Sequence, residues 1–146
     1  MSPLQALQQA LAGEHAAVYL YGVLGGRVPA SEHADLAARL AAGYATHRGR
    51  RDRLTALVRE AGGEPVAAEV SYRLPNPCRT PGQLRGAALE VERRCADVYA
   101  ATVAGTARQD RAWAADALGD SAVRQLSFGG TPQPYPGMPD RRGTTP

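Results

Sequence analysis

The feature that most constrains the fold of this chain is an apolar stripe near its N-terminus. Leucine, valine or tyrosine occupies positions 4, 7, 11, 18 and 21. These intervals of three, four, seven and three residues place the side chains on one face of an α-helix, which we expect from about Pro3 to Leu24. The remaining slot of the stripe holds Glu14. A buried carboxylate is costly unless it is paired or protonated, so the fold must supply a partner for Glu14.

The composition favours an all-α fold. Alanine is abundant, β-branched residues are sparse, and aromatic residues make up only 5% of the chain. A length of 146 residues suits one domain. The net charge of +3, carried by arginine without any lysine, is weak for a dedicated nucleic-acid-binding protein. The first residues show no basic segment followed by an apolar run, and no stretch approaches roughly 20 apolar residues, so we expect a cytoplasmic protein with no membrane contact.

Glycine pairs and capping residues set the expected limits of the first three helices. Gly25-Gly26 ends the first helix and Gly62-Gly63 ends the second, for which Ser31 is the expected N-cap. Thr80 and Gln83 predict a capping box at the start of the third helix.

A fourth helix and a C-terminal tail complete the chain. Thr106 and Gln109 predict a second capping box, and the helix ends before Gly129-Gly130. The last twenty residues contain five prolines and four glycines, which favours a tail over a helix or sheet. We therefore expect a bundle domain over residues 1–127 and a tail over residues 128–146. The candidate anchors of this tail are Phe128, Tyr135 and Met138.

A long connection between the second and third helices predicts the topology. Residues 64–79 can cover about 50 Å when extended, at roughly 3.3 Å per residue. Antiparallel neighbours in a bundle need only about 2–8 linking residues. The third helix should therefore run parallel to the second, after a crossover along the bundle.

The first helix also predicts a partner surface. Its second half is apolar on more than one side, at Tyr19, Leu20, Val23 and Leu24. A subunit interface is the simplest way to cover the additional face, so we expect a homodimer.

The two cysteines are expected to remain free thiols. Cys95 would lie about 21 Å along the third helix, at 1.5 Å per residue, whereas the chain from Cys78 to Pro81 reaches only about 10 Å. We expect at least one of the thiols to pack in the core.

Three helices each place a side chain that can bind metal or transfer protons on the inward face. These side chains are Glu14, His47 and Glu92, whereas Glu90 points outward on the helical wheel. Carboxylates and imidazoles bind iron, manganese and zinc, and bundle cores hold such sites. The same groups can also form a metal-free network, in which charged His47 or Arg51 neutralises Glu14. Both interpretations stay open.

Further residues near these groups are assigned lesser roles. Tyr44, one turn before His47, and His15, at the border of the first stripe, are secondary candidates for the site. Tyr72 and Tyr99 are expected to be packing aromatics, and Asp120 a surface or flanking residue.

The basic cluster Arg48-Gly49-Arg50-Arg51-Asp52-Arg53 points to different sides of its helix. A solvated and partly paired face is therefore expected, and weak nucleic-acid binding is the alternative. No interleaved aromatic residues support that alternative.

Four short motifs, taken together, resemble one family. They are residues 10–19 (ALAGEHAAVY), 44–48 (YATHR), 72–75 (YRLP) and 92–99 (ERRCADVY). To about residue 138, the chain resembles the ferritin-like superfamily and, more narrowly, an actinobacterial ferritin-like family of unassigned function. The resemblance implies an all-α, four-helix ferritin-like bundle with one long crossover.

The resemblance also implies a degenerate metal site. Ferritin-like di-iron enzymes supply one glutamate from each of two helices and a Glu-x-x-His pair from each of the other two. Glu14 and Glu92 match the single glutamates and His47 matches one histidine, but Tyr44 replaces the glutamate of that pair. The fourth helix has neither glutamate nor histidine. A non-enzymatic structural or interaction module is therefore favoured, and the alternative is an iron- or manganese-binding oxidoreductase or iron-handling protein.

Overall fold

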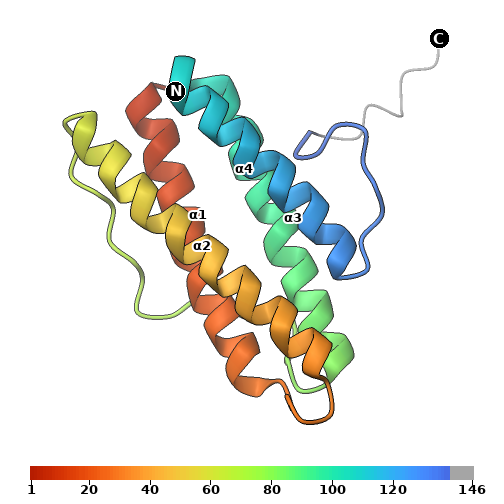
Figure 1. Ribbon diagram of the computed structural model, residues 1–146. Helices are drawn as coiled ribbons and strands as arrows, with labels where there is room; N and C mark the ends of the chain where they lie inside the picture. The colour runs from red at the N-terminus through yellow and green to blue at the C-terminus, as the bar shows by residue number, and fades with distance from the viewer. Residues whose placement is uncertain (139–146) are drawn as a thin grey trace.

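Four α-helices form the bundle in residues 1–138, the part of the chain that the computed structural model describes (Figure 1). They are α1 (Pro3–Arg27), α2 (Ala34–Glu60), α3 (Pro81–Gly105) and α4 (Arg108–Ser127). α1 packs against both α2 and α3, and α3 packs against α4. Residues 1–138 contain no β-strand. The all-α, four-helix prediction is confirmed.

The connection between α2 and α3 runs the length of the bundle. Residues 61–80 contain no helix and return along the outside of the bundle to the end at which α2 began (Figure 1). As a result α2 and α3 run in the same direction, and α1 and α4 run in the opposite one. The predicted crossover is confirmed.

Two of the helix limits differ from those expected from glycine and serine. α1 continues through Gly25-Gly26 to Arg27, because the helical bond from Val28 N–H to Leu24 O still forms at 3.1 Å. α2 begins at Ala34 rather than after Ser31. Ser31 lies in a turn in which the N–H groups of residues 32 and 33 both donate to Pro29 O, so the chain is not yet helical there.

The capping contacts also differ in part from the prediction. A complete capping box forms between Ser2 and Gln5, around Pro3 at the first position of α1. Thr80 caps α3 as predicted, but the Gln83 side chain accepts from Arg79 N–H and the box is not closed.

The capping box predicted for α4 is wrong. The N-cap is Ala107, and it provides no side-chain hydrogen bond. The Thr106 hydroxyl instead donates to Thr102 O at 2.6 Å, in the last turn of α3. Thr106 therefore lies one residue before the N-cap of α4, and its hydroxyl is directed back to α3.

The crossover covers part of the second apolar face of α1. The ring of Tyr19 packs against that of Tyr72, with 5.5 Å between centroids. Gln8 bonds both Glu64 O and Val66 N–H, and His15 Nε2 lies 2.9 Å from Val66 O. The chain itself therefore covers a face from which a partner subunit was inferred, and the homodimer stays a prediction.

The tail contacts the bundle through a residue that was not expected to anchor it. Phe128 is buried as predicted, but Tyr135 is 68% exposed and Met138 is 57% exposed. Gly137 has a φ of 71°, and a Cβ on it would overlap the carbonyl of Ala96 in α3. The close backbone approach at Gly137 thus sets the path of the tail. Residues 139–146 lie outside the described residues, and the division between bundle and tail at residue 127 stays a prediction.

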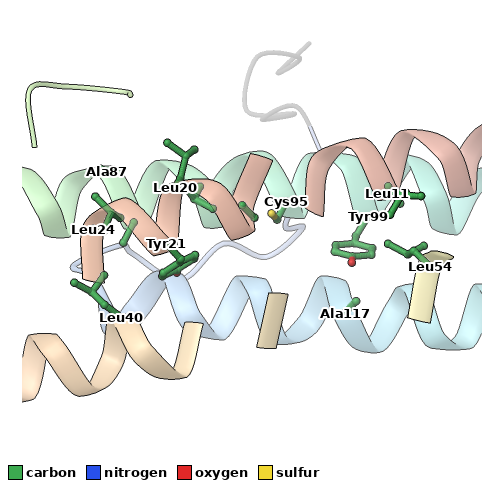
Figure 2. Close-up of a cluster of buried hydrophobic side chains, with 14 of the residues drawn as sticks. Leu11, Leu20, Tyr21, Leu24, Leu40, Leu54, Ala87, Cys95, Tyr99 and Ala117 are labelled. Atoms are coloured by element: carbon green, nitrogen blue, oxygen red, sulfur yellow. The ribbon is translucent and has the colours of Figure 1, made fainter. Parts of the chain in front are cut away.

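The core of the bundle depends on one close approach between α1 and α2. Tyr21 is among the largest fully buried side chains (Figure 2). Its ring lies against Gly43. A Cβ at position 43 would overlap the Tyr21 ring. Gly43 therefore creates the space in which this tyrosine enters the core.

We predict that Gly43→Ala destabilises the protein, although alanine is the better helix former. Overpacking against the Tyr21 ring should lower the free energy of unfolding by about 1–3 kcal/mol. This loss is larger than the stabilisation that alanine gives to a helix relative to glycine. The matched control is Gly49→Ala on the same helix, where a Cβ meets no atom within 4 Å. That control should gain about 0.5–1 kcal/mol. Urea unfolding of both variants checks the prediction, and equal stabilisation would contradict it.

Candidate functional site

Two buried carboxylates lie on either side of the His47 imidazole in the bundle core. His47 Nδ1 is 2.6 Å from Glu14 Oε2, and His47 Nε2 is 3.0 Å from Glu92 Oε1. The three side chains come from α1, α2 and α3, and each is at most 1% exposed. The structure therefore brings together the three residues that helical periodicity places on the inward faces.

The two contacts of His47 require both of its ring nitrogens to donate. A carboxylate oxygen accepts hydrogen bonds, and a neutral imidazole has only one N–H group. Burial by itself lowers the pKa of His47, but hydrogen bonds with Cys95, Glu14 and Glu92 outweigh burial and raise the pKa to about 12. His47 is therefore an imidazolium at neutral pH, stacked on the Tyr21 ring with 5.1 Å between centroids.

Two buried tyrosines complete the hydrogen bonding of the carboxylates. The Tyr99 hydroxyl of α3 donates to Glu14 Oε1 of α1, and the Tyr21 hydroxyl of α1 donates to Glu92 Oε1 of α3, each at 2.5 Å. Burial raises the pKa of both hydroxyls above the ordinary value, and the charge of the bonded glutamate adds to this. Both tyrosines therefore remain protonated donors.

These tyrosines were missed as site residues because both lie on apolar stripes. Tyr21 was counted as part of the first stripe, and Tyr99 was expected only to pack. A signal was present in the sequence, since Tyr21 follows Glu14 by seven residues and Tyr99 follows Glu92 by seven. Seven residues are two helical turns, so each glutamate and tyrosine share one face. A buried tyrosine hydroxyl usually has a hydrogen-bond partner.

A second cation reaches the network from α4. Arg124 Nε lies 3.4 Å from Glu92 Oε1, and Arg124 Nη2 bonds Asp120 Oδ2 at 3.0 Å and Thr46 Oγ1 at 3.1 Å. Glu14 and Glu92 are thus balanced by the imidazolium of His47 and by Arg124. Two negative and two positive groups give a core with no net charge.

Arg50 also enters the core, contrary to the expectation of a solvated arginine face. It is 9% exposed, and its guanidinium bonds Asp120 Oδ2 at 2.5 Å, Ser121 Oγ at 3.0 Å and Ala117 O at 3.2 Å. The guanidinium carbon also lies 5.4 Å from the centre of the Tyr99 ring. Asp120 is 45% exposed, in agreement with its expected place at the surface or flank, and it bridges Arg50 and Arg124 and so joins α2 to α4.

The remaining candidates lie away from this network. Arg51 pairs with Asp52 and not with Glu14. Tyr44 packs beside Gly22, and within residues 1–138 its hydroxyl is not a hydrogen-bond partner of Glu14, His47 or Glu92. His15 faces the crossover, as described above.

Cys95 is a further group with metal-binding chemistry next to His47. One donor atom each of Glu14, His47 and Cys95 lies within 4.8 Å of the others. Burial raises the pKa of the Cys95 thiol to about 11, so the thiol is neutral. Cys78 and Cys95 are both buried and unpaired, as predicted. Figure 2 shows Cys95 and Tyr99 on α3 among apolar side chains from all four helices.

The comparison with protein families gives one match over most of the chain. The family described as "Domain of unknown function (DUF4439)" matches residues 6–140. The chain belongs to this family. Within residues 1–138, no helix of this DUF4439 protein has the length and apolar character that crossing a membrane requires.

One solved structure shares the fold of this DUF4439 chain. It is the crystal structure of a conserved hypothetical protein, rv2844, from Mycobacterium tuberculosis. The two chains are 28% identical and superpose with a TM-score of 0.79, over 86% of this chain and 93% of the mycobacterial one. The comparison with curated proteins gives no match.

The protonated His47 predicts a loss of stability as the pH rises above neutrality. The folded pKa is raised from 6.5 to about 12, so its contribution is complete below pH 6.5 and declines above it. Between pH 7 and 8.5 the folded state should hold one more proton than the unfolded state. The free energy of unfolding should then fall by about 1.4 kcal/mol per pH unit.

Urea unfolding across this pH range measures the slope. The His47→Gln variant should lack this loss, and the control His33→Gln, at a partly exposed position outside the network, should keep it. Above pH 9 the raised pKa of Cys95 should steepen the loss, because its thiol ionises first in the unfolded chain. A wild-type stability that stays constant from pH 7 to 8.5 would contradict the assignment.

Proposed function

We propose that this DUF4439 protein is a ferritin-like bundle that acts as a non-enzymatic structural or interaction module. In this proposal the His47 imidazolium holds the place of a core metal ion. The observation that carries the proposal is the pair of contacts from His47 to the carboxylates of Glu14 and Glu92. A metal ligand needs a free ring-nitrogen lone pair, and here both ring nitrogens face carboxylate oxygens.

The ferritin-like part of the proposal is supported by topology. Four helices, a long crossover and inward carboxylates on α1 and α3 agree with that architecture. The di-iron ligand set does not fit this chain. α4 contains no glutamate or histidine and instead directs Arg124 towards Glu92, so a cation stands near the carboxylate.

A single metal ion is the second candidate, and a specific observation favours it. Glu14, His47 and Cys95 bring a carboxylate, an imidazole and a thiol within 4.8 Å of one another. In residues 1–138, Glu92 Oε2 is buried without a hydrogen-bond partner and could serve as a further oxygen donor. A thiolate in the set would favour zinc over manganese, whereas the carboxylates also suit iron and manganese. Such an ion would have to displace the protons of His47 and Cys95.

Nucleic-acid binding through the Arg48–Arg53 cluster has less support. Arg50 is buried against α4, and Arg51 and Arg53 are paired with Asp52 and Glu60. The pairing of Arg51 and Arg53 agrees with the expected solvated and partly paired face and leaves a weakly basic surface.

Metal analysis and the Glu14→Gln variant distinguish the metal-free network from a bound metal ion. We predict that protein from cultures supplemented with iron, manganese and zinc carries far less than one metal ion per chain, measured by elemental mass spectrometry. Glu14→Gln should leave His47 without its counter-charge and lower the free energy of unfolding by about 3–5 kcal/mol. Added metal or EDTA should not change the stability of the wild type.

The matched control is Glu90→Gln, a partly exposed carboxylate on α3 that pairs with Arg94. It should change the stability by less than about 0.5–1 kcal/mol. Near-stoichiometric metal that is lost in Glu14→Gln and kept in Glu90→Gln would overturn the metal-free proposal and establish the second candidate.

A further inference from the structure

A cavity of about 210 Å³ lies between α1 and α3, beside the ion network. Glu14, Cys95 and Tyr99 line its buried side, and the polar groups of Glu14 and Tyr99 are hydrogen-bonded within the core. Small residues of α1 and valines of α3 form its sides. These residues are Ala10, Gly13, Ala16, Val91 and Val98. The cavity is therefore an apolar space next to a charge-balanced core.

The cavity is not a consequence of helix packing alone. A Cβ on Gly13 would lie 3.6 Å from Val98 Cγ1, which is an ordinary van der Waals contact. An alanine would therefore fit at this position and would favour the helix, because glycine is a poor helix former. Glycine at position 13 therefore keeps open a part of the cavity that an alanine side chain would occupy.

The size and charge of the cavity indicate its occupant. An apolar cavity of about 150 Å³ is large enough to bind benzene, so one of about 210 Å³ has room for a slightly larger apolar group. The one exposed charged side chain in its lining is Arg94, which is 59% exposed, since Glu14 is buried and neutralised by His47. Arg94 contacts Glu90 through Nε, and its Nη nitrogens can pair with a carboxylate.

We propose that this cavity binds a small organic carboxylate with an aromatic or branched apolar body. The apolar body fills the space beside Gly13, and the carboxylate pairs with Arg94. This assigns a ligand class to a place beside the His47 network, with which it shares Glu14, Cys95 and Tyr99 as lining residues. It does not depend on whether the core holds a metal ion, so its failure and that of the proposed function can be told apart.

Fluorine NMR on the full chain tests the proposal with two probes of the same shape. The first probe, 4-fluorobenzoate, carries the carboxylate, and the second, 4-fluorobenzamide, is its neutral counterpart. Both should bind in a saturable way, because both fill the apolar space. The benzoate should bind about two- to fivefold more tightly, which is the effect of a partly exposed ion pair.

Two pairs of variants locate the binding. Gly13→Leu should weaken both probes by about tenfold or more, because the side chain occupies the cavity. Gly49→Leu, at an open position of α2, should leave binding unchanged. Arg94→Gln should lower the affinity for 4-fluorobenzoate to that for the amide, and Arg93→Gln, exposed on the same helix, should not.

Thermal unfolding and helix content show whether each variant is folded. If Gly13→Leu is unfolded, the smaller Gly13→Ala replaces it and should weaken both probes to a lesser degree. The absence of saturable binding to the wild type, or binding that a folded Gly13→Leu retains, would overturn the cavity site. Equal affinity for the two probes, with no effect of Arg94→Gln, would overturn the carboxylate assignment.

Discussion

The structure depends on one imidazole that donates to two buried carboxylates. Glu14 and Glu92 lie on helices that pack directly against each other, and neither could remain charged in an apolar core without a cation between them. His47 supplies that cation from α2, and Arg124 supplies a second from α4. The network therefore links all four helices through charge as well as through apolar packing. A buried network of this kind specifies one arrangement of the helices, because another register would leave a charge without its partner.

The hydrogen bonds between α1 and α3 are reciprocal. Each helix carries a glutamate and, two turns later, a tyrosine, and each tyrosine donates to the glutamate of the other helix. Both carboxylates consequently receive a hydroxyl and an imidazolium N–H. The arrangement explains why an α1–α3 contact lined by alanine, glycine and valine is compatible with a polar centre. The two tyrosines supply the hydroxyl donors that the small and apolar residues of this contact lack.

Much of the fold followed from periodicity and from the length of one connection. The 3.6-residue period determines which residues share a face, so the inward placement of Glu14, His47 and Glu92 could be predicted. Arg50 was missed although it lies between His47 and Leu54 on the same stripe, because an arginine is rarely buried without a partner. Its partner, Asp120, lies on another helix, and the sequence does not show which side chains of different helices meet. The helix caps predicted at Ser31 and Thr106 were wrong for local reasons. Ser31 lies in a turn closed by Pro29 O, and the Thr106 hydroxyl bonds Thr102 O at the end of α3.

The central claim is that His47 is an imidazolium held between two carboxylates. Nitrogen-15 NMR of the His47 ring at pH 9 tests it most directly, because an unperturbed histidine is neutral at that pH. The account predicts that both ring nitrogens carry a proton, with chemical shifts of an imidazolium that do not titrate between pH 6 and 9. A neutral ring, with one unprotonated nitrogen and a titration near pH 6.5, would contradict it.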